Sequence, residues 1–435
     1  MIGILKKILL AALILGAMIA GWLWHINYND GVNVSGPVEP VAAAEGQAAL
    51  LERGAYLARA GNCMACHTAR GGEAWAGGRP IATPFGTLYS SNLTPAPDAG
   101  LGQWNSAEFW RALHHGRSRD GRLLYPAFPY THTTQIVRAD SDALYAYLQS
   151  LKPVSETVPD HQLSWPYGTQ AALAVWRALY FQPGTYQEDP QRGKEWNRGA
   201  YLVRGLAHCS ACHTPRDSLA GGNWQDLSGG LMPTQGWYAP SLQSPREAGL
   251  ADWPVQDIVR LLQTGYAHNA STSGPMAEVV SQSTQYLSTD DLSAMAVYLK
   301  SLPQQAEVAR PETSANERRS YNVAAGQKIY ENRCASCHGS EGQGVPNAYP
   351  RLSGNRAVTL PHTENLMQSV LYGGFGASTA GHARPFAMPP FVLELTDPEL
   401  AAVLSYIRNS WGNQAPEVSI LDVHTMRANS RSTLD

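Results

Sequence analysis

All six cysteines of this 435-residue chain lie in three copies of one short pattern, Cys-x-x-Cys-His. The pattern attaches c-type haem, because two thiols one helical turn apart add to the porphyrin vinyl groups and the adjacent imidazole binds the iron. We therefore predict three covalently bound haems c. The predicted haem-binding residues are Cys63, Cys66 and His67, then Cys209, Cys212 and His213, then Cys334, Cys337 and His338.

Zinc sites and redox dithiols are the two other chemistries that use Cys-x-x-Cys pairs. A zinc site would need a second cysteine pair to complete four ligands, and it would leave the histidine after every pair unexplained. A dithiol needs no histidine at all. The pattern therefore favours haem, and no cysteine is left over for a disulfide.

Composition narrows the class of protein further. Charged residues make up 15% of the chain and its net charge is -3, so nothing indicates nucleic-acid binding. Neither G-x-G-x-x-G nor a P-loop occurs, which disfavours a nucleotide cofactor of its own. The length is typical of about three domains, one for each motif.

Each motif sits inside a repeated set of predicted helices. An opening helix precedes each motif, at RGAYL (53–57), at RGAYL again (198–202) and at AGQKIYENRC (325–334). A middle helix ending at glycine follows at 107–116, 255–265 and 363–374. Closing helices, each with a Ser, Thr or Asp before an acidic first turn, are predicted at 139–151, 288–302 and 396–411.

The closing helices carry tyrosines at corresponding positions. We expect these tyrosines to pack the closing helix against the opening helix rather than to act in chemistry. They are Tyr147, Tyr298 and Tyr406.

An all-α architecture of three tandem domains follows from these repeats. The predicted segments are an anchor or signal (1–26), a tether (27–48), domain 1 (49–155), a linker with an apolar helix (156–192), domain 2 (193–302), a polar linker (303–320), domain 3 (321–412) and an irregular tail (413–435). The linker helix is expected to pack within the chain, with the membrane or a catalytic subunit as alternatives.

The N-terminus predicts a membrane location. Lys6 and Lys7 precede an unbroken apolar run (8–24) that ends in two tryptophans, as at a membrane interface. The run is longer than a usual signal core and no cleavage site follows closely, so an uncleaved anchor is favoured over a signal peptide. The lysines place the N-terminus in the cytoplasm and the haem domains on the periplasmic side.

Methionines supply candidate sixth ligands for two haems. A loop after the middle helix reads SGPMAEVV in the second repeat and FAMPPF in the third, and we predict Met276 and Met388 as iron ligands. Met232, Met295 and Met367 fit a loop or a helix interior instead.

The chain resembles the three-haem cytochrome c subunit of bacterial membrane-bound periplasmic dehydrogenases. The stretches that carry the resemblance include GGRPIATPFGTLYSSNLTP (77–95), RGAYLVRGLAHCSACHTPR (198–216) and GWYAPSL (236–242). The resemblance implies class I cytochrome c domains. It also implies an electron-transfer subunit without substrate chemistry of its own, which passes electrons from a catalytic subunit to membrane ubiquinone or a terminal oxidase.

The resemblance leaves the partner open among several branches. These are quinoprotein alcohol dehydrogenases, flavin-dependent gluconate or sorbitol dehydrogenases, and molybdopterin aldehyde or N-heterocycle dehydrogenases with an iron–sulfur subunit. The alcohol and gluconate branches typically carry methionine where this chain has Phe128, so the molybdopterin branch is favoured.

The first haem lacks a nearby methionine, because none occurs between Met64 and Met232. Histidine is the obvious replacement. We predict His132 as the sixth ligand, because it lies four residues beyond Phe128 in a loop that two prolines restrict. An open or water-bound iron is the second alternative and His115 the third. An open iron would also allow an alternative function, that of a multihaem peroxidase.

Overall fold

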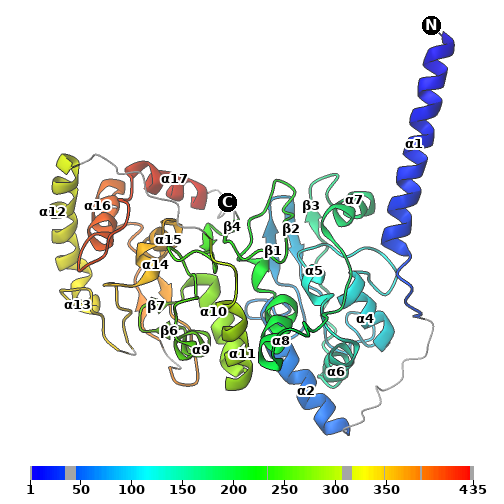
Figure 1. Cartoon of the computed structure of the whole chain (residues 1–435), viewed down its shortest axis with the longest axis horizontal. Helices are drawn as coiled ribbons and strands as arrows, with labels where there is room; N and C mark the ends of the chain where they lie inside the picture. The colour runs from blue at the N-terminus through cyan, green and yellow to red at the C-terminus, as the bar shows by residue number, and fades with distance from the viewer. Residues whose placement is uncertain are drawn as a thin grey trace. The chain divides into compact units, whose positions relative to one another are not determined.

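The computed structural model describes residues 2–34, 46–232, 234–305, 316–346, 348–382 and 385–431. The chain forms two compact units whose elements are labelled in Figure 1. Unit 1 comprises Met1–Ala58, Cys63–Gln187 and Asp217–Asn223, and unit 2 comprises Arg59–Asn62, Glu188–Arg216 and Trp224–Asp435. Both units are mostly helical, as the repeats predicted, but they also contain short strands, which the all-α prediction did not include.

Unit 1 carries the N-terminal helix and the first motif. Its strands form one antiparallel sheet of order β1-β2-β3, in which Ile81 pairs with Leu88 and Gly86 with Leu163. Its elements are α1 (Ile2–Tyr28), α2 (Gln47–Ala60), α3 (Cys63–Cys66), β1 (Pro80–Thr83), β2 (Gly86–Tyr89), α4 (Ser106–His115), α5 (Tyr130–Thr133), α6 (Arg138–Gln149), β3 (Gln162–Leu163) and α7 (Gln170–Tyr180).

Unit 2 carries the second and third motifs, and its strands pair as three two-stranded antiparallel ribbons. The second repeat holds α8 (Lys194–Tyr201), η1 (Leu202–Leu206), η2 (Cys209–Ala211), β4 (Gly230–Met232), β5 (Trp237–Ala239), α9 (Val255–Thr264), β6 (Tyr266–Ala267), β7 (Ala270–Ser271), α10 (Gly274–Gln282), η3 (Thr284–Tyr286) and α11 (Thr289–Lys300). The third holds α12 (Asn316–Arg333), α13 (Ala335–His338), α14 (Arg356–Thr359), α15 (Glu364–Tyr372), β8 (Gly374–Phe375), β9 (Ala387–Met388), α16 (Asp397–Arg408) and α17 (Ile420–Arg431).

A glycine contact joins the opening and closing helices in each repeat. A Cβ added at Gly54, Gly199 or Gly326 would lie 2.0, 1.9 or 2.2 Å from the carbonyl oxygen of Ala143, Ala294 or Ala402 on the closing helix. The same Cβ would meet the Cβ of the predicted tyrosine, namely Tyr147, Tyr298 or Tyr406. The packing role of these tyrosines is therefore confirmed, and the two helices approach closely because glycine has no side chain.

An ion pair supports this contact in two of the three repeats. Arg53 on α2 pairs with Asp140 on α6 at 2.5 Å, and Arg198 on α8 pairs with Asp291 on α11 at 2.7 Å. Each arginine directly precedes the contact glycine, and each aspartate lies in the first turn of its closing helix. The third repeat has Ala325 at the arginine position and lacks this ion pair.

The middle helices end where the glycine pattern predicted. Gly116 and Gly265 cap α4 and α9 in left-handed conformations with φ of 57° and 80°, which glycine adopts at no steric cost. At its start, α4 has a capping box in which Asn105 and Glu108 satisfy each other's backbone N–H groups. Local sequence thus fixes α4 at both ends and α9 at its C-terminal end.

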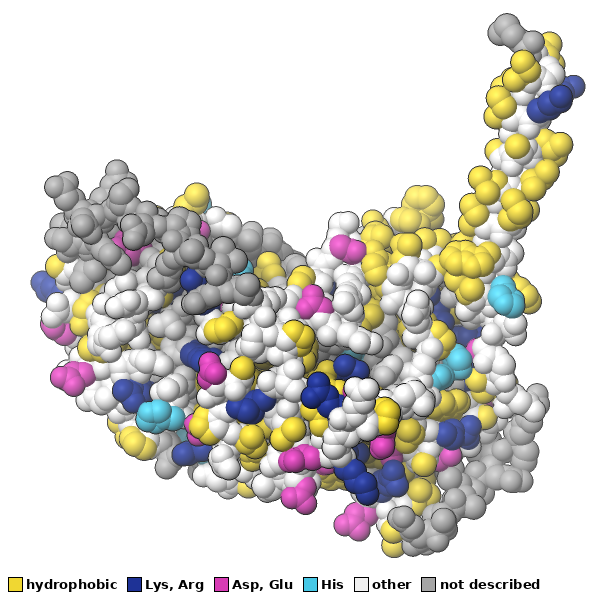
Figure 2. Space-filling view, in the orientation of Figure 1, with side chains coloured by type: hydrophobic (Ala, Val, Ile, Leu, Met, Phe, Trp, Pro, Cys, Tyr) yellow, Lys and Arg dark blue, Asp and Glu magenta, His cyan; other side chains and the backbone are white. Residues whose placement is uncertain are grey.

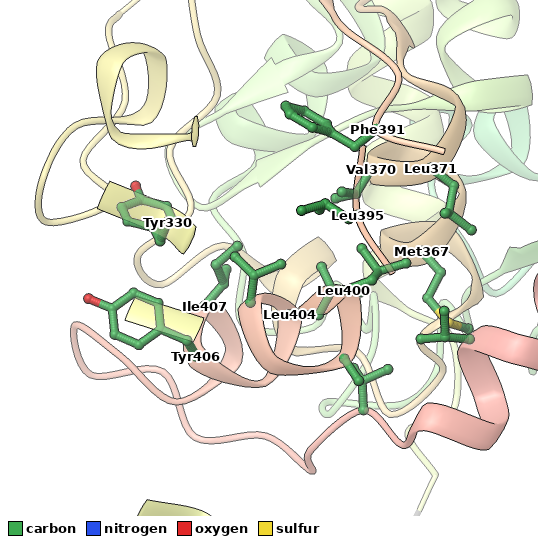
Figure 3. Close-up of a cluster of buried hydrophobic side chains, with 14 of the residues drawn as sticks. Tyr330, Met367, Val370, Leu371, Phe391, Leu395, Leu400, Leu404, Tyr406 and Ile407 are labelled. Carbon is green, nitrogen blue, oxygen red and sulfur yellow. The ribbon is translucent and has the colours of Figure 1, made fainter. Parts of the chain in front are cut away.

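The tail was wrongly predicted to be irregular. Residues 420–431 form α17, which packs on the core of the third repeat through Val423 and Met426. Figure 3 shows side chains of this core, including Leu400 and Leu404 from α16 and Met367 and Leu371 from α15. Arg427 also pairs with Asp397 at the start of α16, so the tail completes the third repeat.

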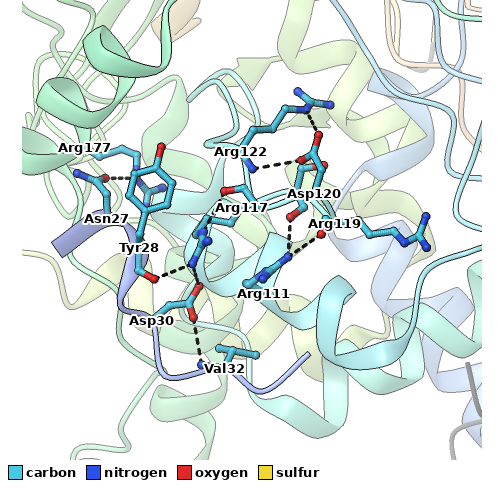
Figure 4. Close-up of polar contacts among 12 residues, drawn as sticks. Asn27, Tyr28, Asp30, Val32, Arg111, Arg117, Arg119, Asp120, Arg122 and Arg177 are labelled. Atoms are coloured by element: carbon cyan, nitrogen blue, oxygen red, sulfur yellow. Dashed lines mark hydrogen bonds and ion pairs between the residues drawn. The ribbon is translucent and has the colours of Figure 1, made fainter. Parts of the chain in front are cut away.

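Part of the expected tether is docked on unit 1. Helix α1 extends to Tyr28, and its last turn contacts unit 1 through Asn27, whose side chain accepts a hydrogen bond from Arg177 Nε at 2.7 Å (Figure 4). Asp30 forms an ion pair with Arg117, which also donates to the Tyr28 carbonyl at 3.1 Å. Residues 35–45 of the tether and 306–315 of the polar linker lie outside the described residues, and α12 begins inside that linker at Asn316.

Replacing Gly199 by alanine should destabilise unit 2. In a free helix this change stabilises by about 1 kcal/mol. Here we expect a loss of about 1–3 kcal/mol, because the new methyl group overlaps the Ala294 carbonyl. Thermal unfolding of the haem-loaded chain measures the effect. Gly381→Ala is the matched control, since a Cβ there meets open space; equal melting temperatures for the two variants would contradict the contact.

Candidate haem sites

Each Cys-x-x-Cys-His motif forms one tight turn after an opening helix. In every copy the backbone N–H of the histidine donates to the carbonyl of the first cysteine at 3.0 Å. The three donor and acceptor pairs are His67 to Cys63, His213 to Cys209 and His338 to Cys334. None of the six cysteines forms a disulfide, and Cys66 and Cys212 are exposed. The turn therefore offers both thiols and the imidazole together, as covalent haem attachment requires.

The three motif histidines are held in the same way. Nδ1 of His67 lies 2.6 Å from the Ser91 carbonyl, Nδ1 of His213 lies 2.7 Å from Pro240 O, and Nδ1 of His338 lies 3.0 Å from Pro350 O. A proton on Nδ1 makes each bond and leaves the Nε2 lone pair for iron.

Burial keeps these histidines neutral. It lowers the pKa of His67, His213 and His338 below the ordinary value, because the imidazolium form loses its hydration. Neutral imidazole is the form that binds a metal ion. The donor set of two thiols and one oriented, neutral imidazole thus fits haem c at all three motifs.

Met388, a predicted sixth ligand, lies in strand β9 of the third repeat. It is partly buried against the same hydrophobic cluster that Cys334 contacts, so the fold brings the third motif and this methionine to one core. Met367 and Met295 are buried in the helix interior, as expected.

Met276 lies in a different setting from the one predicted. The stretch around it was expected to be a loop, but Gly274–Gln282 forms helix α10 and Met276 lies in its first turn. Its side chain packs against a small cluster of Ala277, Val280 and Ala377.

His132 lies in the short helix α5 and is buried, with 1% of its surface exposed. Its Nδ1 lies 3.0 Å from the Thr131 hydroxyl. A buried imidazole is available to an iron inside the domain, and the loop before it is restricted by two prolines. Its burial also distinguishes His132 from histidines that lie on the surface.

The other histidines of unit 1 have structural partners. His114 is buried and stacks on Trp110 with ring centroids 4.4 Å apart. Burial, with the charge of neighbouring His114, lowers the pKa of His115 to about 4. His161 accepts the Tyr89 backbone N–H at 3.2 Å through Nδ1.

Within unit 2, specific side-chain contacts join the second repeat of the chain to the third. The side chain of Asn365 accepts the Tyr238 N–H at 2.8 Å and donates to the Tyr238 carbonyl at 2.7 Å. The His362 ring stacks on the Tyr238 ring with centroids 3.7 Å apart. Tyr238 lies two residues before Pro240, whose carbonyl holds His213, so this contact adjoins the second haem site.

Sequence reasoning missed both the carbonyl partners of the histidines and this contact. Backbone carbonyls carry no residue signature, so nothing in the sequence points to Ser91, Pro240 or Pro350 as acceptors. Asn365 and His362 gave no signal either, because single polar residues at the start of a helix are common.

Three motifs that each orient a histidine beside two thiols define a c-type cytochrome, a protein that binds haem covalently. The cytochrome c family model matches residues 51–152 and 323–411, which contain the first and third motifs.

Relatives of known activity match most of the chain. The cytochrome c subunit of the quinone alcohol dehydrogenase of Gluconacetobacter polyoxogenes is 39% identical over 88% of this chain and 85% of its own length. The gluconate 2-dehydrogenase cytochrome c subunit of Pantoea cypripedii is 37% identical over 91% and 93%. A nicotinate dehydrogenase subunit of Pseudomonas putida is 39% identical over 87% of this chain but 32% of its own length. The chain belongs to the family of cytochrome c subunits that relay electrons in membrane-bound dehydrogenase complexes.

Proposed function

We propose that the chain consists of three class I cytochrome c domains at 49–155, 193–302 and 321–412, each with one covalently bound haem c. Two features that occur once in each of the three repeats support this count. They are the glycine contact between opening and closing helices and the bond from the motif histidine to a carbonyl. The bond from the motif histidine to a carbonyl is the observation that best supports the function, because it orients three imidazoles for iron binding.

The proposed axial ligands are His67 with His132, His213 with Met276, and His338 with Met388. The shared core of Cys334 and Met388 supports the third pair. Burial of His132 and the absence of methionine between residues 64 and 232 support the first. Met276 is supported by its matching place after the middle helix, in a helix turn rather than a loop.

In this proposal the chain relays electrons from a dehydrogenase catalytic subunit to membrane ubiquinone or a terminal oxidase. Bound haem supplies one-electron iron chemistry. The chain's own residues hold each imidazole neutral and oriented, and the Tyr238–Asn365 contact is one of those that hold the second and third repeats together. No residue of the chain is assigned substrate chemistry.

We propose a molybdopterin catalytic subunit with an iron–sulfur subunit as the partner. The support is Phe128, which stands where the alcohol and gluconate branches typically carry methionine, together with the likeness to a nicotinate dehydrogenase subunit. Alcohol and gluconate dehydrogenase relatives are about as similar. A quinoprotein or flavoprotein partner is therefore the alternative.

The proposed location is the inner membrane, with the haem domains on the periplasmic side. Helix α1 spans 27 residues, has a mean hydropathy of 2.2 in its most apolar window, and is exposed along that window. Lys6 and Lys7 at its N-terminal end favour a cytoplasmic N-terminus.

Purification from the source membrane tests this function directly. We expect the intact mass of the chain to show three haem additions, because each motif offers two thiols and one imidazole. We expect it to co-purify with a molybdopterin subunit and a small iron–sulfur subunit. Two or fewer additions on a fully matured sample would refute the count, and a quinoprotein or flavoprotein partner would refute the Phe128 argument.

Substitution of the two methionines should move two separate redox potentials. Thioether ligation stabilises reduced iron, so Met276→His and Met388→His should each lower one haem potential and leave the other two nearly unchanged. Spectroelectrochemical titration measures the waves. Met367→Leu, in the buried core, is the control and should leave all three waves in place. Titrations unchanged in both histidine variants would contradict the ligand assignment.

Substitution of His132 by alanine tests the first site. We expect the wild-type haem to be six-coordinate and low-spin, and the variant to gain a high-spin signal confined to one haem. Electron paramagnetic resonance measures the spin state. His115→Ala is the companion variant, and a high-spin signal there instead would transfer the ligand to His115. A wild-type sample already one-third high-spin would favour an open iron, and peroxide turnover would then test the peroxidase alternative.

A further inference from the structure

Helix α7 has one buried side and one exposed, apolar side. Leu173 and Arg177 are buried and face unit 1, whereas Val175 and Leu179 are 46% and 61% exposed. The exposed pair is four residues apart, so it forms one stripe. Arg177 is the only charged residue of α7, and it points inward, so the exposed stripe carries no charge.

Two neighbouring segments carry further exposed apolar side chains. Trp165, five residues before α7, is 86% exposed and follows Ser164, whose N–H donates to the Phe85 carbonyl at 2.8 Å. Leu219 is brought to the helix by the Trp176 indole N–H, which donates to the Leu219 carbonyl at 3.0 Å. We call Trp165, Val175, Leu179 and Leu219 the α7 surface. Figure 2 shows hydrophobic side chains gathered beside the foot of α1.

The foot of α1 is joined directly to α7. The Asn27 amide donates to the Ala174 carbonyl at 3.1 Å and its oxygen accepts from Arg177 Nε at 2.7 Å. Arg177 is 4% exposed and lies over the ring of Phe181, 4.6 Å from its centroid. The joint is therefore buried and bidentate, and it fixes α7 to the last turn of the anchor helix.

The joint sets the depth of α7 relative to the apolar run of α1. Asn27 lies three residues beyond Trp24, which is about 4.5 Å along a helix axis. The polar interface of a bilayer leaflet is roughly 5–8 Å thick. If Trp24 lies at the hydrocarbon boundary, as interfacial tryptophans do, the part of α7 that contacts Asn27 lies inside the headgroup region.

We propose that the α7 surface lies on the bilayer leaflet from which α1 emerges, so that unit 1 is seated on the membrane rather than tethered above it. The four side chains of the α7 surface are uncharged, with the Asp217 carboxylate nearby on the Tyr180 hydroxyl, and exposed tryptophan and leucine suit the headgroup and acyl boundary. The occupant is lipid because the surface continues from the contact between α7 and the foot of the anchor. This inference rests on the proposed membrane location of α1.

Depth-dependent quenching in vesicles tests the proposal. The full-length, haem-loaded chain is reconstituted in phosphatidylcholine and phosphatidylglycerol vesicles, without any dehydrogenase. The proposed haems occupy all six native cysteines, so Leu179→Cys gives one thiol for an environment-sensitive fluorophore. Quenching by nitroxide-labelled lipid is expressed as a ratio to the same variant in unlabelled lipid, which removes the effect of haem.

Leu393→Cys is the matched control, because Leu393 is 96% exposed in unit 2, and Leu15→Cys reports on α1. We expect quenching at position 179 to be roughly threefold stronger than at position 393. Equal quenching at 179 and 393, with strong quenching at 15, would overturn membrane seating and leave the anchor standing. Weak quenching at 15 would overturn the anchor itself. A second measurement is the reaction of Leu179→Cys with aqueous maleimide. If residue 179 were protected only when dehydrogenase is added, or more strongly at higher protein density, the surface would be assigned to a protein partner.

Discussion

The contact between opening and closing helices, made without a side chain, is the constraint on which each repeat depends. Gly54, Gly199 and Gly326 let the backbone of one helix touch the backbone of the other. The motif turn follows the opening helix directly, so the position of that helix determines where the thiols and imidazole lie. A side chain at the contact would therefore displace the haem-attachment turn as well as loosen the core.

Much of the helical frame could be predicted from the sequence. Caps such as Asn105 with Glu108 and stops such as Gly265 are local signals, so the middle and closing helices were found close to their true bounds. The tail was missed although Ser419 and Asp422 exchange the hydrogen bonds of a capping box. Helix α10 was mistaken for a loop because Gly-Pro resembles a break, whereas proline in a first turn favours a helix.

In the haem sites, too, some features could be predicted from the sequence and others could not. The motif residues could be read directly, because thiol and imidazole spacing is set by covalent chemistry. The orientation of each imidazole could not, since it depends on carbonyls 24, 27 and 12 residues away along the chain. Sixth ligands fall between these cases, because the residue type is restricted to a few but its approach to iron is decided by tertiary packing.

The second site illustrates how tertiary packing and haem chemistry are linked. Strand β5 carries Tyr238 at the contact with α15, and the chain reaches Pro240 two residues later. The Pro240 carbonyl orients His213, so the same short segment serves both the interface and the iron ligand. Loss of the Asn365 amide would thus remove two of the hydrogen bonds that hold this segment. The Asn365 amide, which bonds to the Tyr238 backbone, therefore links the interface between the two repeats to the segment that orients one iron ligand.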